Sequence, residues 1–106
     1  MKALLTVSAL AILLAAAPAQ SAEQTVGISD YAFSPAKLSV TAGTKVTWIN
    51  HDQVPHRVVE KDKRFHSAAL DTDDSYSLTF SQPGTFQYFC ALHPRMTGTV
   101  TVVAGR

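Results

Sequence analysis

Three side chains that bind soft metals lie close together near the C-terminal end of the sequence. Cys90, the only cysteine, is followed by His93 and Met96. Thiolate, imidazole and thioether ligands suit copper, whereas structural zinc sites use cysteine, histidine and carboxylates. With a second imidazole, this set is typical of trigonal blue-copper electron-transfer sites, in which the thioether is a weak axial ligand.

The second imidazole has three candidates upstream, His51, His56 and His66. His56 follows Pro55 and precedes a β-branched stretch, so it would enter from the start of a strand. His51 lies in the same loop, and His66 lies in a polar segment with little pattern. The residues alone leave all three open.

Each ligand residue also has a plainer interpretation. Cys90 could be an inert buried residue, His93 a solvated loop histidine and Met96 a core filler. A structural zinc site or a thiol-redox site is a further alternative. One cysteine cannot form an internal disulfide, however, and a small exported domain often needs a metal or disulfides for stability.

The N-terminal residues predict a signal peptide. Lys2 precedes an uncharged stretch, residues 3–17, and small residues then lead to cleavage after Ala19 or Ala22. The apolar run is shorter than the roughly 20 residues that span a bilayer. We therefore expect export to a bacterial periplasm and a mature form that does not span a membrane.

Removal of the predicted signal peptide, residues 1–22, leaves one small domain, residues 23–106. The nine basic residues fall to eight when Lys2 is lost, which equals the eight acidic residues. A neutral domain lacks the strongly basic face that binding to nucleic acid requires. Nucleic acid is therefore not an expected partner.

Short β-branched and alternating segments dominate the rest of the chain. They predict an all-β fold, an antiparallel β-sandwich of about seven strands, with turns at 31–35 and an irregular segment at 61–74. Trp48, Phe86 and Tyr88 are expected in its core. The predicted strands are residues 25–28, 37–40, 45–50, 57–60, 75–80, 85–90 and 98–103.

Three motifs carry a resemblance to a known family. Trp48-Ile49-Asn50, Pro55-His56 and Cys90-x2-His93-Pro94-x-Met96 resemble the cupredoxins, and within them most closely the amicyanins, over residues 25–103. The resemblance implies a Greek-key sandwich that binds one copper ion, cycling between Cu(II) and Cu(I). The ligands that it implies are His56, Cys90, His93 and Met96.

The resemblance also assigns roles around the metal. Asn50 would tie the two ligand loops together beside the Cys90 sulfur, an outer hydrogen bond of the kind that tunes a metal. His51 and His66 would be exposed loop residues. An apolar face around His93 would dock partners, and its expected residues are Val54, Pro55, Arg57, Leu92, Pro94 and Arg95.

The function implied is that of a monomeric periplasmic blue copper protein that carries single electrons. It is not expected to be an enzyme, because four protein ligands leave no open position for a substrate. Amicyanins receive electrons from a dehydrogenase and pass them to a c-type cytochrome, so similar redox partners are possible here. The alternative is a periplasmic copper carrier without an electron-shuttle role.

Overall fold

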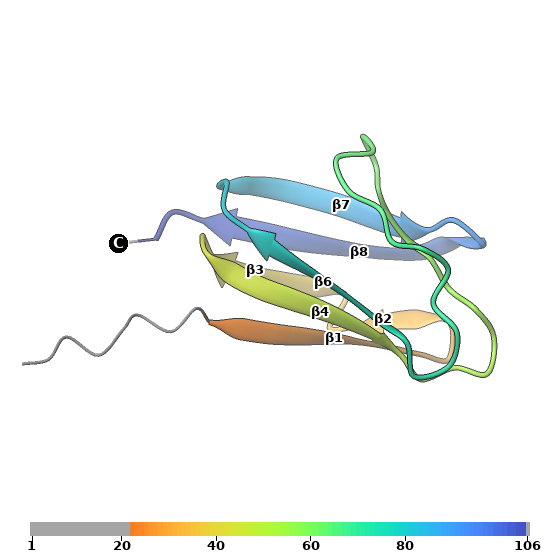
Figure 1. The fold of residues 1–106 in the computed structure, drawn as a ribbon. Helices are drawn as coiled ribbons and strands as arrows, with labels where there is room; N and C mark the ends of the chain where they lie inside the picture. Colours follow the sequence, from red (N-terminus) through yellow and green to blue (C-terminus); the bar gives the residue numbers. More distant parts are fainter. Residues whose placement is uncertain (1–21, 106) are drawn as a thin grey trace, which may run out of the picture.

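The computed structural model describes residues 22–105, so the predicted signal peptide lies outside the described residues except for Ala22. This part of the chain contains strands and no helix (Figure 1). The strands are β1 (Glu23–Ser29), β2 (Ala32–Ser34), β3 (Lys37–Thr41), β4 (Thr44–Asn50), β5 (Val58–Glu60), β6 (Ser75–Phe80), β7 (Gly84–Cys90) and β8 (His93–Val103).

Two four-stranded sheets form the layers of a sandwich, with strand orders β2-β1-β4-β6 and β3-β8-β7-β5 (Figure 1). The predicted β-sandwich is confirmed. Each sheet nevertheless contains one parallel pair, β1 with β4 and β3 with β8, so both sheets are mixed rather than purely antiparallel. The chain passes from the first sheet to the second between β2 and β3, and β4 then returns beside β1 in the same direction.

The strand that the sequence did not predict is β2. Residues 31–35 were expected as a turn, but only Asp30 and Tyr31 turn the chain, and Ser29 pairs directly with Ala32. Both turn residues have positive φ, 53° and 59°. This is the geometry of a two-residue hairpin loop, which usually contains Asn-Gly or Asp-Gly. Tyr31 therefore occupies a backbone conformation that favours glycine.

The core lies between the sheets and is centred on Trp48, which is fully buried in β4. Its ring packs against Tyr76 and Phe80 of the neighbouring strand β6 and against Phe65 of the β5–β6 connection. It also lies edge-on to Tyr88 of β7, with 5.4 Å between the ring centroids. Removing such a buried aromatic ring costs about 3–5 kcal/mol. Trp48 and Tyr88 are thus core residues, as predicted, and Phe86 is partly buried against the same core.

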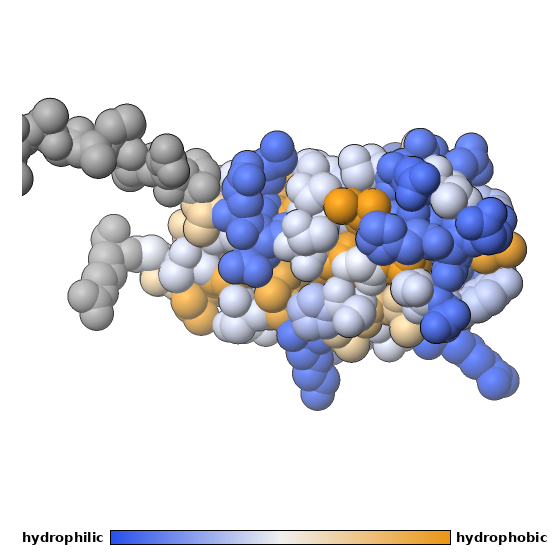
Figure 2. All heavy atoms as spheres, turned by 90° about the horizontal axis from the view of Figure 1, so that it is seen from below, coloured by the Kyte–Doolittle hydropathy of each residue, from blue (hydrophilic) through white to orange (hydrophobic). Residues whose placement is uncertain are grey.

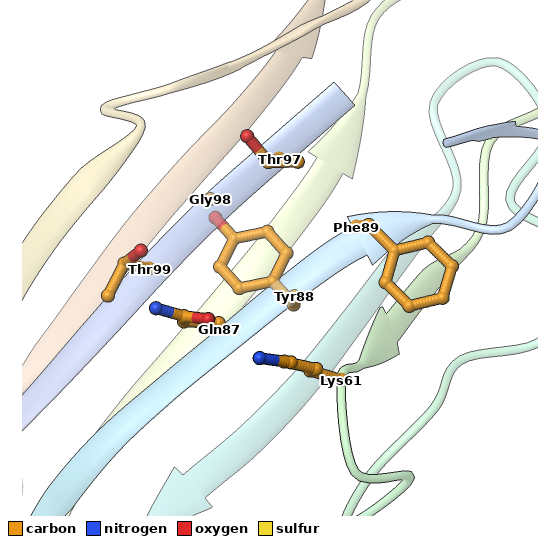
Figure 3. Close-up of a pocket in the computed structure, with 7 residues that line it drawn as sticks. All are labelled: Lys61, Gln87, Tyr88, Phe89, Thr97, Gly98 and Thr99. Carbon is orange, nitrogen blue, oxygen red and sulfur yellow. The ribbon is translucent and has the colours of Figure 1, made fainter. Parts of the chain in front are cut away.

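Gly98 of β8 allows this packing because it pairs with Tyr88 of β7. A Cβ atom at Gly98 would overlap the Tyr88 ring. In Figure 3 the Tyr88 side chain lies against β8 at Gly98, with Thr97 and Thr99 on either side. Burial of the phenol raises the pKa of Tyr88 to about 12. Strands β7 and β8, which carry the predicted ligand loop, are locked together at this point.

The predicted irregular segment, residues 61–74, connects β5 in one sheet to β6 in the other. It is anchored by two isolated bridges, Val59 with His66 and His56 with Leu70. The second bridge fixes a predicted metal ligand between the sheets. In the view of Figure 2, polar side chains cover much of the surface and apolar residues show between them. No helix in residues 22–105 is long and apolar enough to cross a membrane.

Candidate metal centre

Cys90 and His56 meet in the core at one end of the sandwich. Cys90 is the last residue of β7 and pairs with Val58 of β5. His56 lies two residues before Val58. Both side chains are fully buried. The Cys90 Sγ atom lies 3.6 Å from His56 Nδ1. The end of β7 and the residues just before β5 therefore place a thiol and an imidazole nitrogen side by side.

The backbone and the ring of His56 are both fixed. Its amide donates to the Leu70 carbonyl at 3.1 Å, and the Leu70 amide donates to the His56 carbonyl at 2.7 Å. Its ring Nε2 lies 2.8 Å from Oδ2 of Asp52. A carboxylate only accepts hydrogen bonds, so Nε2 carries the proton and the Nδ1 lone pair faces the sulfur.

The Cys90 sulfur receives a backbone hydrogen bond. The amide of Arg57, next to His56, donates to Sγ at 3.3 Å, and the Ala91 amide returns a bond to the Arg57 carbonyl at 3.1 Å. An N–H group that points at a ligating sulfur tunes a bound metal. Residues 56–57 and 90–91 are thus held together by their main chains.

His93 follows Cys90 across a tight turn. The two residues are partners at the beginning of the β7–β8 ladder. The His93 ring is partly exposed, and its centroid lies 5.1 Å from that of His56. Within residues 22–105, no three side chains among His, Cys, Asp and Glu are gathered closely enough to hold a metal ion. His93 thus lies beside the Cys90–His56 pair without completing it.

Met96 is the buried residue of the ligand loop, only 5% exposed. It lines one pocket together with His93, and the full lining is Tyr31, Leu92, His93, Pro94, Arg95 and Met96. Met96 is thus a core residue that also lines this pocket, three residues after His93 on β8, so its thioether is available as a weak ligand.

This donor set fits copper. A buried sulfur that accepts an N–H bond, an imidazole whose Nδ1 faces that sulfur and a buried thioether are soft and intermediate ligands, which select Cu(I) and Cu(II) over hard cations. The buried Cys90 is also a free cysteine. As a coordinating set, the four predicted ligands stay a prediction.

Asn50 makes different connections from those expected. Its amide nitrogen donates to the carbonyls of Val54 and Leu70, both at 2.9 Å, and its oxygen accepts the Asp52 amide at 2.9 Å. These bonds organise the 51–56 loop and join it to residue 70. In the part of the chain that the structure describes, the bond to the Cys90 sulfur comes from Arg57 and none comes from Asn50.

The two other histidines lie in exposed positions, as the sequence suggested. His51 packs beside Gly27 on the outside of β1, and His66 lies 3.4 Å from the Arg57 guanidinium. Of the predicted docking residues, Leu92, Pro94 and Arg95 line a pocket with His93, and the docking role of the set stays a prediction. Pro55, Leu92, Pro94 and Arg95 are exposed, and Val54 and Arg57 are partly so.

Two residues near the histidines were not singled out from the sequence. Asp52 binds His56, and Tyr31 lies edge-on to both His56 and His93, with ring centroids 5.4 and 4.8 Å away. Hydrogen bonds hold the pKa of Asp52 below its usual range, and the bond from the Tyr31 amide has the largest effect. Burial of the carboxyl group acts in the opposite direction. An acidic residue four positions before His56 is the one local signal for Asp52.

The comparisons with known proteins agree on the family. The cupredoxin-like domain family matches residues 2–102. Amicyanin-alpha of Methylorubrum extorquens is 39% identical over 81% of this chain and 75% of its own. A chloroplastic plastocyanin of Physcomitrium patens is 35% identical over 95% of this chain and 68% of its own length. The Cu(I) form of an amicyanin variant has a similar structure, with a TM-score of 0.73 and 33% identity over 83% of this chain and 88% of that one.

The chain belongs to the cupredoxin family. Family membership bears out one copper ion as the cofactor, and it supports the class of blue copper electron carriers. The resemblance to amicyanins, inferred from the short Cys-His-Met spacing, is confirmed by these relatives.

Proposed function

We propose that this protein is an exported, periplasmic type-1 blue copper protein that carries single electrons between redox partner proteins. The observation that carries the proposal is the buried pair of Cys90 Sγ and His56 Nδ1, 3.6 Å apart, with the Arg57 amide aimed at the sulfur. His56, Cys90, His93 and Met96 would hold the metal. Bound copper would supply the one-electron couple Cu(II)/Cu(I).

The contribution of the chain itself is a rigid frame. Main-chain bonds on both sides fix His56 and Cys90, and β8 holds Met96 in the core. Groups that are held in place reorganise little when the charge of the site changes, which favours rapid electron transfer. His93 lies on the tight turn, so coordination through its ring requires that turn to bring it toward the other two groups.

The face around His93 is the proposed docking surface. It combines exposed apolar groups, Leu92 and Pro94, with the positive charge of Arg95, and Arg57 adds a second cation nearby. Apolar contact supplies affinity, and the cations would steer an acidic partner such as a dehydrogenase or a c-type cytochrome. Four protein ligands leave no position for a substrate, so we propose no catalytic role.

Redox cycling at constant copper content tests the function. An electron carrier should be reduced and reoxidised repeatedly with its copper retained throughout, as followed by the visible spectrum and by metal analysis of the desalted protein. A copper carrier without shuttle function should instead lose copper on reduction or transfer it to a chelator. Loss of the metal in each reduced half-cycle would contradict the proposal.

A further inference from the structure

Asp52 accepts three hydrogen bonds from two different parts of the fold. Its Oδ1 accepts the Asp30 amide at 2.7 Å, and its Oδ2 accepts the Tyr31 amide at 3.0 Å and the ring Nε2–H of His56 at 2.8 Å. The carboxylate therefore joins the β1–β2 turn to the imidazole that faces Cys90.

The position of Asp52 is itself fixed. Its amide donates to Asn50 Oδ1 at 2.9 Å, and its carbonyl accepts the Thr72 hydroxyl at 2.7 Å. The neighbouring His51 amide donates to Ile28 at the end of β1 at 2.8 Å. A carboxylate that is anchored on both sides can hold its partners in one geometry.

The turn that Asp52 binds is strained. Asp30 and Tyr31 both have left-handed backbone, which costs about 1–2 kcal/mol for each residue with a side chain. The two amide bonds to Asp52 offset that cost. The strained geometry brings the Tyr31 ring edge-on to His56 and His93. Strain of this kind is retained where the surroundings determine the conformation, often at functional sites.

We infer that Asp52 is a positioning residue for the metal centre, acting through His56 while its other bonds hold the Tyr31 ring over the two histidines. Its charge favours Cu(II) over Cu(I), because the more highly charged ion gains more from a nearby anion. Its bond to Nε2 fixes the tautomer and the orientation of the ring. This inference rests on the proposed copper site.

The test compares Asp52→Asn with Asp52→Glu and with the charge control Glu23→Gln. Glu23 is exposed at the opposite end of β1. Copper affinities in both oxidation states, the reduction potential and the visible spectrum are measured on the loaded proteins. Outer groups of this type change metal affinity about 10–100-fold. We expect Asp52→Asn to bind Cu(II) about tenfold more weakly while Cu(I) binding is almost unchanged, which raises the potential by up to ~59 mV.

The control variants separate positioning from simple structural support. Asp52→Glu should recover part of the shift, and Glu23→Gln should match the unaltered protein. If Asp52→Asn lowers the melting temperature but leaves the potential and spectrum unchanged, the carboxylate is structural only and the inference is overturned.

A measurement on the metal-free protein separates this inference from the proposed function. The His56 Nε2–H resonance should be slow to exchange with solvent in the unaltered protein and fast in Asp52→Asn, as seen by ¹⁵N NMR. An equal exchange rate in both overturns the inference even if copper binds. If that resonance behaves as expected but no protein binds copper, Asp52 still positions His56 and the proposed function fails instead.

Discussion

The ring of Tyr31 stands edge-on to the ring of His93, with 4.8 Å between the ring centroids and 83° between the planes. Tyr31 is half exposed, at 50%, whereas His56 beneath it is fully buried. The tyrosine thus forms part of the boundary between the two imidazoles and solvent. It also lines the pocket that contains His93 and Met96.

Replacement of Tyr31 should open this boundary without unfolding the protein. Tyr31→Gly removes the ring and suits the φ of 59°, so thermal stability should change little. Oxidation of the reduced copper protein by hexacyanoferrate(III), which takes up one electron to become hexacyanoferrate(II), should become severalfold faster, as measured by stopped flow. Tyr31→Phe keeps the ring and should react like the unaltered protein. An unchanged rate in Tyr31→Gly would show that the tyrosine does not limit access.

Gly98→Ala should destabilise the domain, because the new Cβ would overlap the Tyr88 ring in the packed core. Overpacking of this kind costs about 1–3 kcal/mol, to be measured by chemical denaturation. Gly27→Ala is a matched control, since a Cβ there would meet its nearest neighbour, the His51 ring, at 3.7 Å. The control should be neutral or slightly stabilising. Equal stability of the two variants would contradict the packing described for Tyr88.

Glu60 should contribute to stability at neutral pH and lose that contribution in acid. The carboxylate is buried, and its bond to the Arg64 guanidinium, with amide bonds from Arg64 and Asp62, lowers its pKa from 4.5 to about 2. Because the pKa is depressed in the folded state, the contribution is complete above pH 4.5 and fades between there and about pH 2.

Melting temperatures of Glu60→Gln across this pH range check the effect. The variant leaves charged and amide donors with a weaker acceptor, so it should lose about 1–3 kcal/mol at pH 7. The difference in melting temperature between the variant and the unaltered protein should become smaller as the pH falls below 4.5. A gap that stays constant down to pH 2 would mean that Glu60 does not titrate in this way.

The sequence predicted those parts of the site that are encoded locally. Cys90, His93 and Met96 are close in sequence, and the soft character of their side chains suggests copper whatever the fold. The β-sandwich was predicted from the alternation of polar and apolar residues and from the turn residues. These patterns indicate which residues of each single strand are buried. Pairing direction is set by the order in which the chain crosses between sheets, so the parallel pairs β1–β4 and β3–β8 were not predicted.

The parts that could not be predicted depend on contacts between distant segments. In the sequence, Asp52 resembles any other acidic loop residue. The β1–β2 turn comes to lie beside it through the parallel pairing of Ile28 with Asn50. Tyr31 is far from Cys90 in the sequence, and its ring meets the histidines from a turn with left-handed backbone. The local sequence offers only the four-residue spacing of Asp52 to His56 and contains no signal for the Tyr31 contact.

The absorption spectrum of the protein loaded with Cu(II) tests the copper centre most directly. The unaltered protein should bind one copper ion and show an intense visible band from thiolate-to-Cu(II) charge transfer. Cys90→Ser should lose that band, whereas His51→Ala and His66→Ala, which change exposed histidines, should retain it. A colourless protein at full copper loading, or a Cys90→Ser variant with the same band, would contradict a copper–thiolate site at Cys90.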